Sequence, residues 1–286
     1  MRFNFIKIRN VFTSLVILLG SYFLYAQGIK FGHYNNNDGL SHNSVRHILQ
    51  DKNGFLWLGT FSGLNRFDGY EFKSYSTSSN AIQNDDITAL ELDELNNSLW
   101  IGTRNGLSRF NMNTHKFTTF LPDAKNSNSL QDPEIRSIHV DRFNRTWVGT
   151  KNKGLFIYEA TENEFIKIEL PKFEYIKDIF EDTKGNIWIG SYKSAGIAKI
   201  ELDEKGAIVN IEEFSLKVPA ITGSNPYVNF IFEDDKSDIF IGSREGLYKL
   251  NQKKNQFENL YIKDVSIREK IGPHFTSIAR APNGKF

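Results

Sequence analysis

The segment QDKNGFLWLGTFSGL, residues 50–64, decides the fold, because its pattern returns four more times along the chain. Every copy has an aromatic residue two positions before a glycine, and a second glycine followed by an aliphatic residue a few positions later. The aromatic residues of the five copies are Trp57, Trp100, Trp147, Trp188 and Phe240. Successive copies are 43, 47, 41 and 52 residues apart, so one structural unit is repeated along most of the chain.

Each repeat contains the signals of four short strands. In the first copy an apolar strand, 45–49, precedes an Asp-x-x-Gly turn at 51–54, and the strand with the tryptophan follows the turn. A third strand begins at the second glycine, and a fourth has the pattern Phe72-x-x-Tyr75. Repeats of this length are typical of propeller blades. We therefore predict an all-β protein, a β-propeller of four-stranded blades with five complete blades and part of a sixth that begins near Phe275.

The residues that repeat have structural roles that explain their spacing. The tryptophans are large enough to fill the space between neighbouring blades, and this role is favoured over sugar-stacking platforms. Gly59 removes a side chain where two backbones converge. The repeated aspartates suggest catalytic carboxylates by number alone, but their fixed place in hairpin turns favours capping of the backbone. These aspartates are Asp51, Asp141, Asp182 and Asp234.

Residues 1–26 are predicted to form an N-terminal signal helix. Arg2, Lys7 and Arg9 precede an apolar run at 11–26, which is shorter than the roughly 20 residues of a membrane-spanning helix. A cleaved signal peptide is favoured over an uncleaved membrane anchor, and in both cases residues 27–286 form an exported propeller domain. The sequence ends inside the sixth repeat, so we expect the propeller to be truncated at its C-terminus.

Composition and motifs exclude several kinds of site. The 286 residues contain no cysteine, which rules out disulfides, thiolate metal ligands and cysteine nucleophiles. The formal net charge is +1, so we expect this region to contact no nucleic acid. His42 and His47 are far better explained as a loop histidine and a solvated strand histidine than as a metal pair. We predict no cofactor, no metal site and no catalytic residue within this sequence.

The first repeat closely resembles the two-component regulator propeller. The likeness is carried by NDGLSHNSV (37–45), QDKNGFLWLGT (50–60) and GLNRFDG (63–69), and it extends over roughly residues 29–286. The resemblance implies the periplasmic sensor of a Bacteroidetes-type hybrid two-component system, in which seven-bladed propellers precede an immunoglobulin-like domain, a membrane helix and a histidine kinase. It further implies an inner-membrane receptor, a homodimer, that detects glycan-derived oligosaccharides and controls transcription. The chain would be its N-terminal fragment.

Ligand-binding residues are expected in the loops between the second and third strands, where blades 2 to 5 each have at least one cation. We name these candidates the loop rim: Arg104, Lys151, Lys153, Tyr192, Lys193 and Arg244. The loops that enter the first strands are expected on the same face, with Asn43, Asp85, Asp86, Glu134, Tyr175 and Tyr227. A ring of cations favours an anionic ligand, such as an acidic or sulfated sugar. Ordinary solvated turn residues are the alternative interpretation.

Three functions fit these features. The first is the periplasmic glycan-sensing domain of a histidine kinase, which the resemblance favours. The second is a secreted propeller enzyme, such as a lyase, and the third is a passive protein-interaction scaffold. Kinase motifs in the gene beyond Phe286 would favour the first function, whereas a stop codon after a seventh blade would favour one of the others.

Overall fold

The computed structural model describes residues 32–192, 196–216, 227–260 and 275–278. The chain divides into two compact units, Met1–Tyr34 and Asn35–Phe286. Of the first unit only residues 32–34 are described, and they form no strand. The predicted signal helix, 1–26, lies outside the described residues, and so does most of the sixth repeat apart from residues 275–278.

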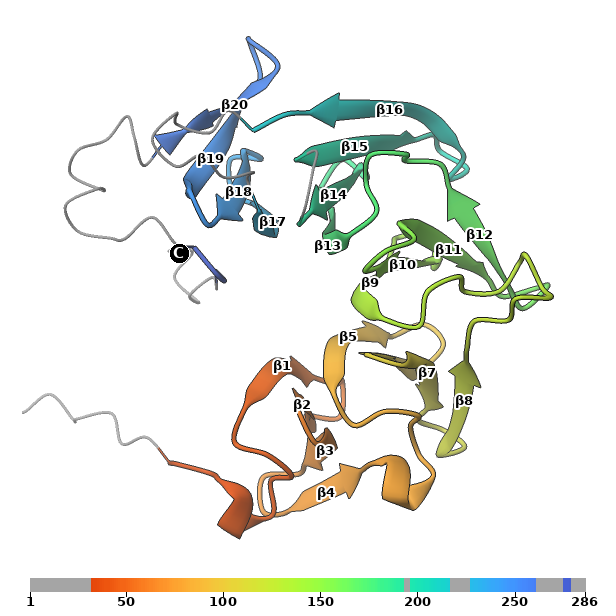
Figure 1. Cartoon of the computed structure of the whole chain (residues 1–286). Helices are drawn as coiled ribbons and strands as arrows, with labels where there is room; N and C mark the ends of the chain where they lie inside the picture. Colours follow the sequence, from red (N-terminus) through yellow and green to blue (C-terminus); the bar gives the residue numbers. More distant parts are fainter. Residues whose placement is uncertain (1–31, 193–195, 217–226, 261–274, 279–286) are drawn as a thin grey trace, which may run out of the picture. The chain divides into compact units, whose positions relative to one another are not determined.

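The second unit contains five four-stranded antiparallel sheets, and the strands of each sheet follow one another in chain order (Figure 1). This confirms the predicted all-β fold with five complete four-stranded blades. The blades are β1 (Val45–Gln50), β2 (Leu56–Thr60), β3 (Gly63–Phe67) and β4 (Phe72–Tyr75); β5 (Ile87–Asp93), β6 (Ser98–Thr103), β7 (Gly106–Asn111) and β8 (Lys116–Phe120); β9 (Ile135–Val140), β10 (Thr146–Thr150), β11 (Leu155–Glu159) and β12 (Glu164–Ile168); β13 (Ile176–Glu181), β14 (Ile187–Ser191), β15 (Ile197–Leu202) and β16 (Ile208–Phe214); and β17 (Val228–Glu233), β18 (Ile239–Ser243), β19 (Gly246–Asn251) and β20 (Gln256–Asn259). Two short 3-10 helices, η1 (Asn36–Asp38) and η2 (Thr77–Ser79), lie in loops.

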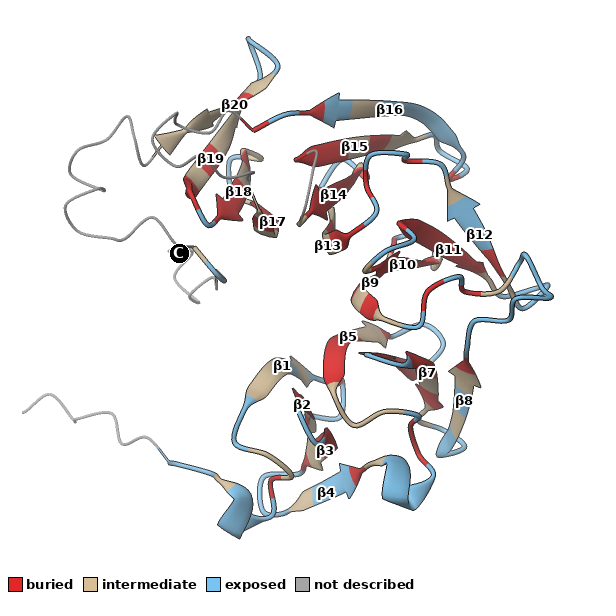
Figure 2. Cartoon of the chain, viewed as in Figure 1, coloured by how far each residue is buried: buried red, intermediate tan, exposed pale blue. Residues whose placement is uncertain are grey.

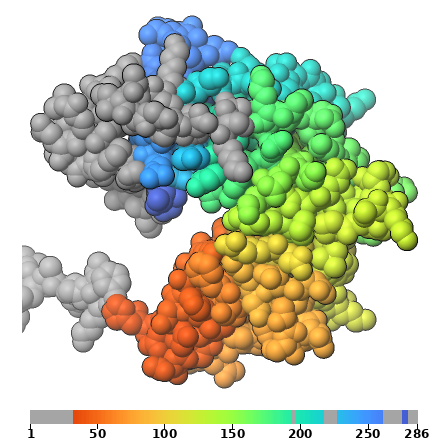
Figure 3. All heavy atoms as spheres, in the orientation of Figure 1, coloured from red at the N-terminus to blue at the C-terminus, as the bar shows by residue number. Residues whose placement is uncertain are grey.

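Neighbouring blades pack through their first strands. Strand β1 contacts β5, β5 contacts β9, β9 contacts β13, and β13 contacts β17. In the space-filling view the described blades follow one another as bands in chain order (Figure 3). The five first strands therefore line the side on which the blades converge, as the apolar character of 45–49 predicted.

The repeated tryptophans form the core between blades, as predicted. All four are at most 2% exposed, and buried residues follow the strands of every sheet (Figure 2). The ring centre of Trp57 lies 5.5 Å from that of Phe110, and the ring centre of Trp100 lies 5.2 Å from that of Tyr158. Both partners belong to the third strand of the next blade. Each tryptophan thus joins two blades by burying apolar surface between them.

The glycine two positions after each tryptophan gives the next blade room to approach. A Cβ atom on Gly102 would lie 2.7 Å from Ile135 Cγ2, a distance that real Cβ atoms do not show. In the first four blades this glycine always faces the first residue of the next blade's first strand. The pairs are Gly59 with Ile87, Gly102 with Ile135, Gly149 with Ile176, and Gly190 with Val228.

The turn aspartates cap the backbone, as predicted, and also bind the tryptophans. Asp51 Oδ1 accepts hydrogen bonds from the backbone N–H groups of Asn53 and Phe55, and Asp51 Oδ2 accepts one from Trp57 Nε1 at 2.8 Å. Asp141 and Asp182 bind the indoles of Trp147 and Trp188 in the same way. The carboxylate therefore fixes both the turn and the tryptophan that follows it six residues later.

The second blade departs from this pattern because its turn is one residue longer. Asp93 precedes Trp100 by seven positions, and its carboxylate accepts hydrogen bonds from the backbone N–H and the side-chain amide of Asn96 instead. Trp100 Nε1 is buried without a hydrogen-bond partner among the described residues. An unpaired buried donor lowers the stability of the folded protein, and the indoles of the other three tryptophans are all hydrogen-bonded.

This difference predicts unequal effects of the same substitution. Trp57→Phe and Trp100→Phe each remove similar packing, but only the first leaves a buried carboxylate oxygen without its donor. We expect Trp57→Phe to lower the free energy of unfolding by about 1 to 3 kcal/mol more than Trp100→Phe does. Urea unfolding of the full chain measures both variants, and equal losses would contradict the role given to Asp51. Phe240 in the fifth blade shows that the position accepts phenylalanine.

In four blades, the threonine or serine directly after the glycine of the second strand makes a hydrogen bond across the loop between the second and third strands. Thr103 Oγ1 donates to the carbonyl of Gly106 at 2.8 Å and accepts from the backbone N–H of Asn105 at 3.1 Å. Thr60, Thr150 and Ser243 make the equivalent bond to Gly63, Gly154 and Gly246. In four blades the loop is thus a short, internally bonded turn, whereas Ser191 Oγ of the fourth blade has no hydrogen-bond partner among the described residues.

Candidate functional site: the axial pocket and its rim

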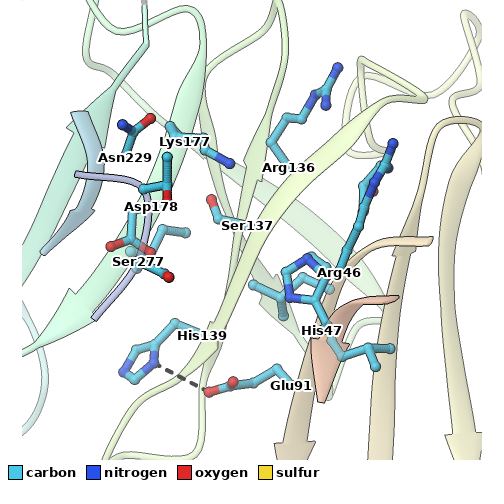
Figure 4. Close-up of a pocket in the computed structure, with 16 residues that line it drawn as sticks. Arg46, His47, Glu91, Arg136, Ser137, His139, Lys177, Asp178, Asn229 and Ser277 are labelled. Atoms are coloured by element: carbon cyan, nitrogen blue, oxygen red, sulfur yellow. Dashed lines mark ion pairs between the residues drawn. The ribbon is translucent and has the colours of Figure 1, made fainter. Parts of the chain in front are cut away.

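A pocket of about 560 Å³ lies where the first strands of the five blades converge (Figure 4). Its lining comes from β1, β5, β9, β13 and β17, together with Thr276 and Ser277. We name it the axial pocket. A volume of this size falls within the range of about 300 to 1,000 Å³ that is usual for small-molecule sites.

A β-bulge interrupts every first strand at the same place in the repeat. In β1 the pairing register shifts between Val45 and His47, so that Arg46 is the extra residue. The same shift occurs in the other four blades. We name the five extra residues the bulge ring: Arg46, Thr88, Arg136, Lys177 and Asn229, all of which line the axial pocket. Bulges re-aim side chains and are common beside binding sites.

Three members of the bulge ring are cations, and two of these are held by acids of the neighbouring loops. Arg46 Nη1 lies 2.5 Å from Asp86 Oδ1, and Arg136 Nη2 pairs with Glu134. Lys177 has no hydrogen bond or ion pair among the described residues. Burial lowers the pKa of Lys177, the carboxylate of Asp178 partly opposes this effect, and the positive charges of Arg136 and Arg46 lower the pKa further. The lysine is thus a half-buried ammonium group that faces like charges across the pocket.

The opposite end of the pocket carries a histidine between carboxylates (Figure 4). His139 Nδ1 lies 3.3 Å from Glu91 Oε1, and His139 Nε2 lies 3.6 Å from Glu181 Oε2. Burial opposes the charged imidazole, but the two carboxylates outweigh it and raise the pKa of His139. Burial also raises the pKa of Asp178 to about 7, although its carboxylate accepts a hydrogen bond from the backbone of Ile231.

The two histidines considered as a metal pair have separate roles. His42 Nδ1 accepts a hydrogen bond from the backbone N–H of Ser44 at 2.9 Å, as expected for a loop histidine. His47 is not solvated as predicted, because it lines the axial pocket, where burial lowers its pKa to about 4. The described residues contain no group of three or more His, Cys, Asp or Glu side chains that could hold a metal ion.

The loop rim is less cationic than its sequence suggests, because acids of the entry loops pair with it. Arg104 pairs with Asp86, and its Nη1 lies 3.7 Å from Glu134 Oε1. Lys151 Nζ lies 2.7 Å from Glu134 Oε2. Asp86 and Glu134 thus connect Arg104 and Lys151 to the two arginines of the bulge ring. Within this network four cations surround two carboxylates.

The remaining loop-rim residues are not part of that network. Lys153 is exposed, and Arg244 is exposed with no ion pair within the described ranges. Lys193 lies outside the described residues. Tyr192 lies between two other tyrosines, with ring centres 4.8 Å from Tyr175 and 4.5 Å from Tyr227. The structure therefore joins the predicted tyrosines of three loops, from two adjacent blades, into one stack.

The bulge ring was missed from sequence because the first strands were treated as apolar throughout. The signal was present: the residue after the first aliphatic residue of each first strand is polar in all five copies. Comparing the copies column by column would have identified it. The tyrosine Tyr175 also contacts this ring, since Arg136 Cζ lies 5.2 Å from its ring centre.

Comparison with known proteins relates two segments of this chain to a protein family. The model of the two component regulator propeller matches residues 39–62 and 172–193. The chain carries two-component regulator propeller repeats. A segment of 38 residues, 13% of this chain, is 63% identical to Histidine kinase P4 of Formosa agariphila. That segment makes up 3% of the kinase.

Solved structures resemble this chain along most of its length. The extracellular domain of the putative hybrid two component system BT3049 from B. thetaiotaomicron matches 80% of this chain at 27% identity, with a TM-score of 0.67. The extracellular domain of the putative one component system BT4673 from the same organism matches 84% at 20% identity, with a TM-score of 0.54. The chain spans 31% and 36% of these structures. A virginiamycin B lyase from Staphylococcus aureus, at 14% identity and a TM-score of 0.57, shares the fold alone; the match covers 76% of this chain and 69% of the lyase.

No helix within the described ranges is both long and apolar enough to cross a bilayer.

Proposed function

We propose that this chain is the ligand-sensing propeller of a hybrid two-component histidine kinase, exported to the periplasm by residues 1–26. The observation that carries the proposal is the likeness over 80% of the chain to the extracellular domain of a putative hybrid two component system. The regulator repeats and the segment shared with a histidine kinase support it. The receptor would lie in the inner membrane as a homodimer and would control transcription through the rest of its chain.

The ligand that fits the rim is an oligosaccharide with an acidic group. Four cations around Asp86 and Glu134 leave an excess of two positive charges at one end of the axial pocket. Beside them lies the stack of Tyr175, Tyr192 and Tyr227, in which Tyr192 and Tyr227 are partly exposed and Tyr175 is buried. Tyrosines of this kind supply contact area at little conformational cost. A sugar ring on the tyrosines would bring its carboxylate or sulfate toward the arginines.

The binding test compares acidic and neutral oligosaccharides by calorimetric titration of the full chain. We expect Arg104→Gln to weaken binding of acidic sugars roughly tenfold, since a bond to a charged group is worth about 1.5 to 3 kcal/mol. Tyr192→Ala should weaken the binding of acidic and neutral sugars alike, because it removes a stacking surface. Lys116→Gln, an exposed change on the outer strand β8, is the matched control. Equal effects of Arg104→Gln and Lys116→Gln would contradict a ligand site at the rim.

The enzyme alternative has weaker support. Its likeness to a lyase is at 14% identity and concerns the fold, and a shared fold does not carry a shared reaction. An interaction scaffold would not need a cationic, half-buried axial pocket. Incubation of the chain with the same oligosaccharides, followed by product analysis, tests for a lyase directly, and any cleavage would overturn the sensor proposal.

A further inference from the structure

The bulge ring places a polar side chain at the same extra position of every first strand, a position that a strand without a bulge would not have. A bulge leaves one residue out of the strand ladder, and it is retained where it aims a side chain usefully. Here the bulge occurs in all five blades, and its residue is Arg, Thr, Arg, Lys or Asn in strands that are otherwise largely apolar. Five equivalent bulges place five hydrogen-bonding side chains around one pocket.

The charges of this ring are unbalanced where they face one another. Arg46, Arg136 and Lys177 lie toward one end of the pocket (Figure 4). Among the described residues no acid of the pocket forms an ion pair with Lys177, although the neighbouring carboxylate of Asp178 partly compensates its charge. Glu91 pairs with His139, and Asp178 Oδ2 accepts a hydrogen bond from the backbone N–H of Ile231. Arg136 Nε and Ser137 Oγ are also buried without a hydrogen-bond partner among the described residues. Like charges held together in a half-buried site destabilise a protein unless a ligand compensates them.

We propose that the bulge ring is a binding site for an oxyanion, a sulfate or phosphate group. Thr88 Oγ1 and Asn229 Nδ2 already donate to the carbonyls of Ile135 and Phe275. The donors left for an oxyanion are the guanidinium and ammonium groups of the ring and the hydroxyl of Ser137, which are groups that recognise such oxygens. Asp86 and Glu134 would position the two arginines, while Lys177 meets the anion directly. The pocket volume of about 560 Å³ leaves space for a sugar or other small organic group that carries the oxyanion. This site shares Arg46 and Arg136 with the charge network of the loop rim, but it is centred on Lys177 and does not require the oligosaccharide proposed there.

The test uses inorganic sulfate and the substitution Lys177→Met in the full chain. By calorimetry at low ionic strength, wild-type protein should bind sulfate, and Lys177→Met should weaken that binding tenfold or more. In the absence of sulfate, Lys177→Met should raise the melting temperature, because it removes a desolvated charge that faces two arginines. This opposite pair of effects is expected of a binding residue and not of a structural one.

Controls separate the bulge ring from general charge effects and from the rim. Lys153→Met removes an exposed loop-rim cation and should leave sulfate binding unchanged. Glucose 6-sulfate and glucose 6-phosphate, compared with the free anions, show whether the group is bound alone or as an ester. Sulfate binding that is absent, or equally weakened by Lys153→Met and Lys177→Met, would overturn the inference. If sulfate binding is lost in Lys177→Met while neutral oligosaccharides still bind, the ring and the rim are independent sites.

Discussion

Gly102→Val is expected to lower the free energy of unfolding by about 3 kcal/mol or more, at the upper end of the usual cost of overpacking a core. The new Cβ would lie 2.7 Å from Ile135 Cγ2 and 3.1 Å from both Ile135 Cβ and Ala89 Cβ. Ile135 is completely buried at the start of β9. It cannot turn away without moving the backbone that joins the second and third blades.

Thermal and urea unfolding of the full chain measure this effect, with Gly32→Val as the matched control. A Cβ on Gly32 would meet only one atom, of Tyr34, at an ordinary 4.0 Å, so the control should change stability by less than about 0.5 kcal/mol. Similar stability of Gly102→Val and wild type would show that the blades do not meet at these glycines.

Asp178→Asn is expected to stabilise the protein above pH 7 and to have little effect below pH 4. Burial raises the pKa of Asp178 from its ordinary value of 3.8 to about 7. A carboxyl whose pKa is higher in the folded state loses stability as the pH rises from its unfolded to its folded value. Asparagine does not ionise, so the variant does not lose stability in this pH range, and its side-chain oxygen still accepts the hydrogen bond from Ile231. At pH 8 the gain should be about 2 to 4 kcal/mol, since one pKa unit corresponds to about 1.4 kcal/mol.

The difference between the two stability curves isolates this group from the histidines of the pocket, because His47 and His139 are common to both proteins. Asp68→Asn is the control: backbone N–H groups of Glu71 and Tyr70 lower the pKa of Asp68 in an exposed turn, so its substitution should bring no gain at high pH. A difference curve for Asp178→Asn that does not change between pH 4 and pH 8 would contradict the burial of this carboxylate.

The repeat predicted the blades because each of its residues has a local role. Trp57, Gly59 and Asp51 have the contacts that their spacing indicates, and those contacts are made within one blade or with its neighbour. Even the exception was visible in the sequence, since Asp93 precedes its tryptophan by seven positions instead of six. Short-range geometry of this kind depends on few residues and so can be inferred from one sequence.

The binding face was predicted only in outline, because it depends on pairing between blades. The sequence placed Arg104 and Glu134 on one face, but it could not show that they form an ion pair. The recurring polar residue marked the position of Lys177, but it did not show that a register shift lies there, since a bulge is decided by how two strands pair. The charges at the site therefore became clear only when the five first strands were seen together.

Hydrogen exchange of the full chain, with and without an oligosaccharide that binds it, tests most directly whether the ligand site lies at the convergence of the first strands. We expect the bound oligosaccharide to slow exchange in peptides that cover 84–91, 134–139 and 175–179, and to leave exchange in the outer strands β8 and β12 unchanged. Protection confined to the outer strands, with the first strands unchanged, would contradict it.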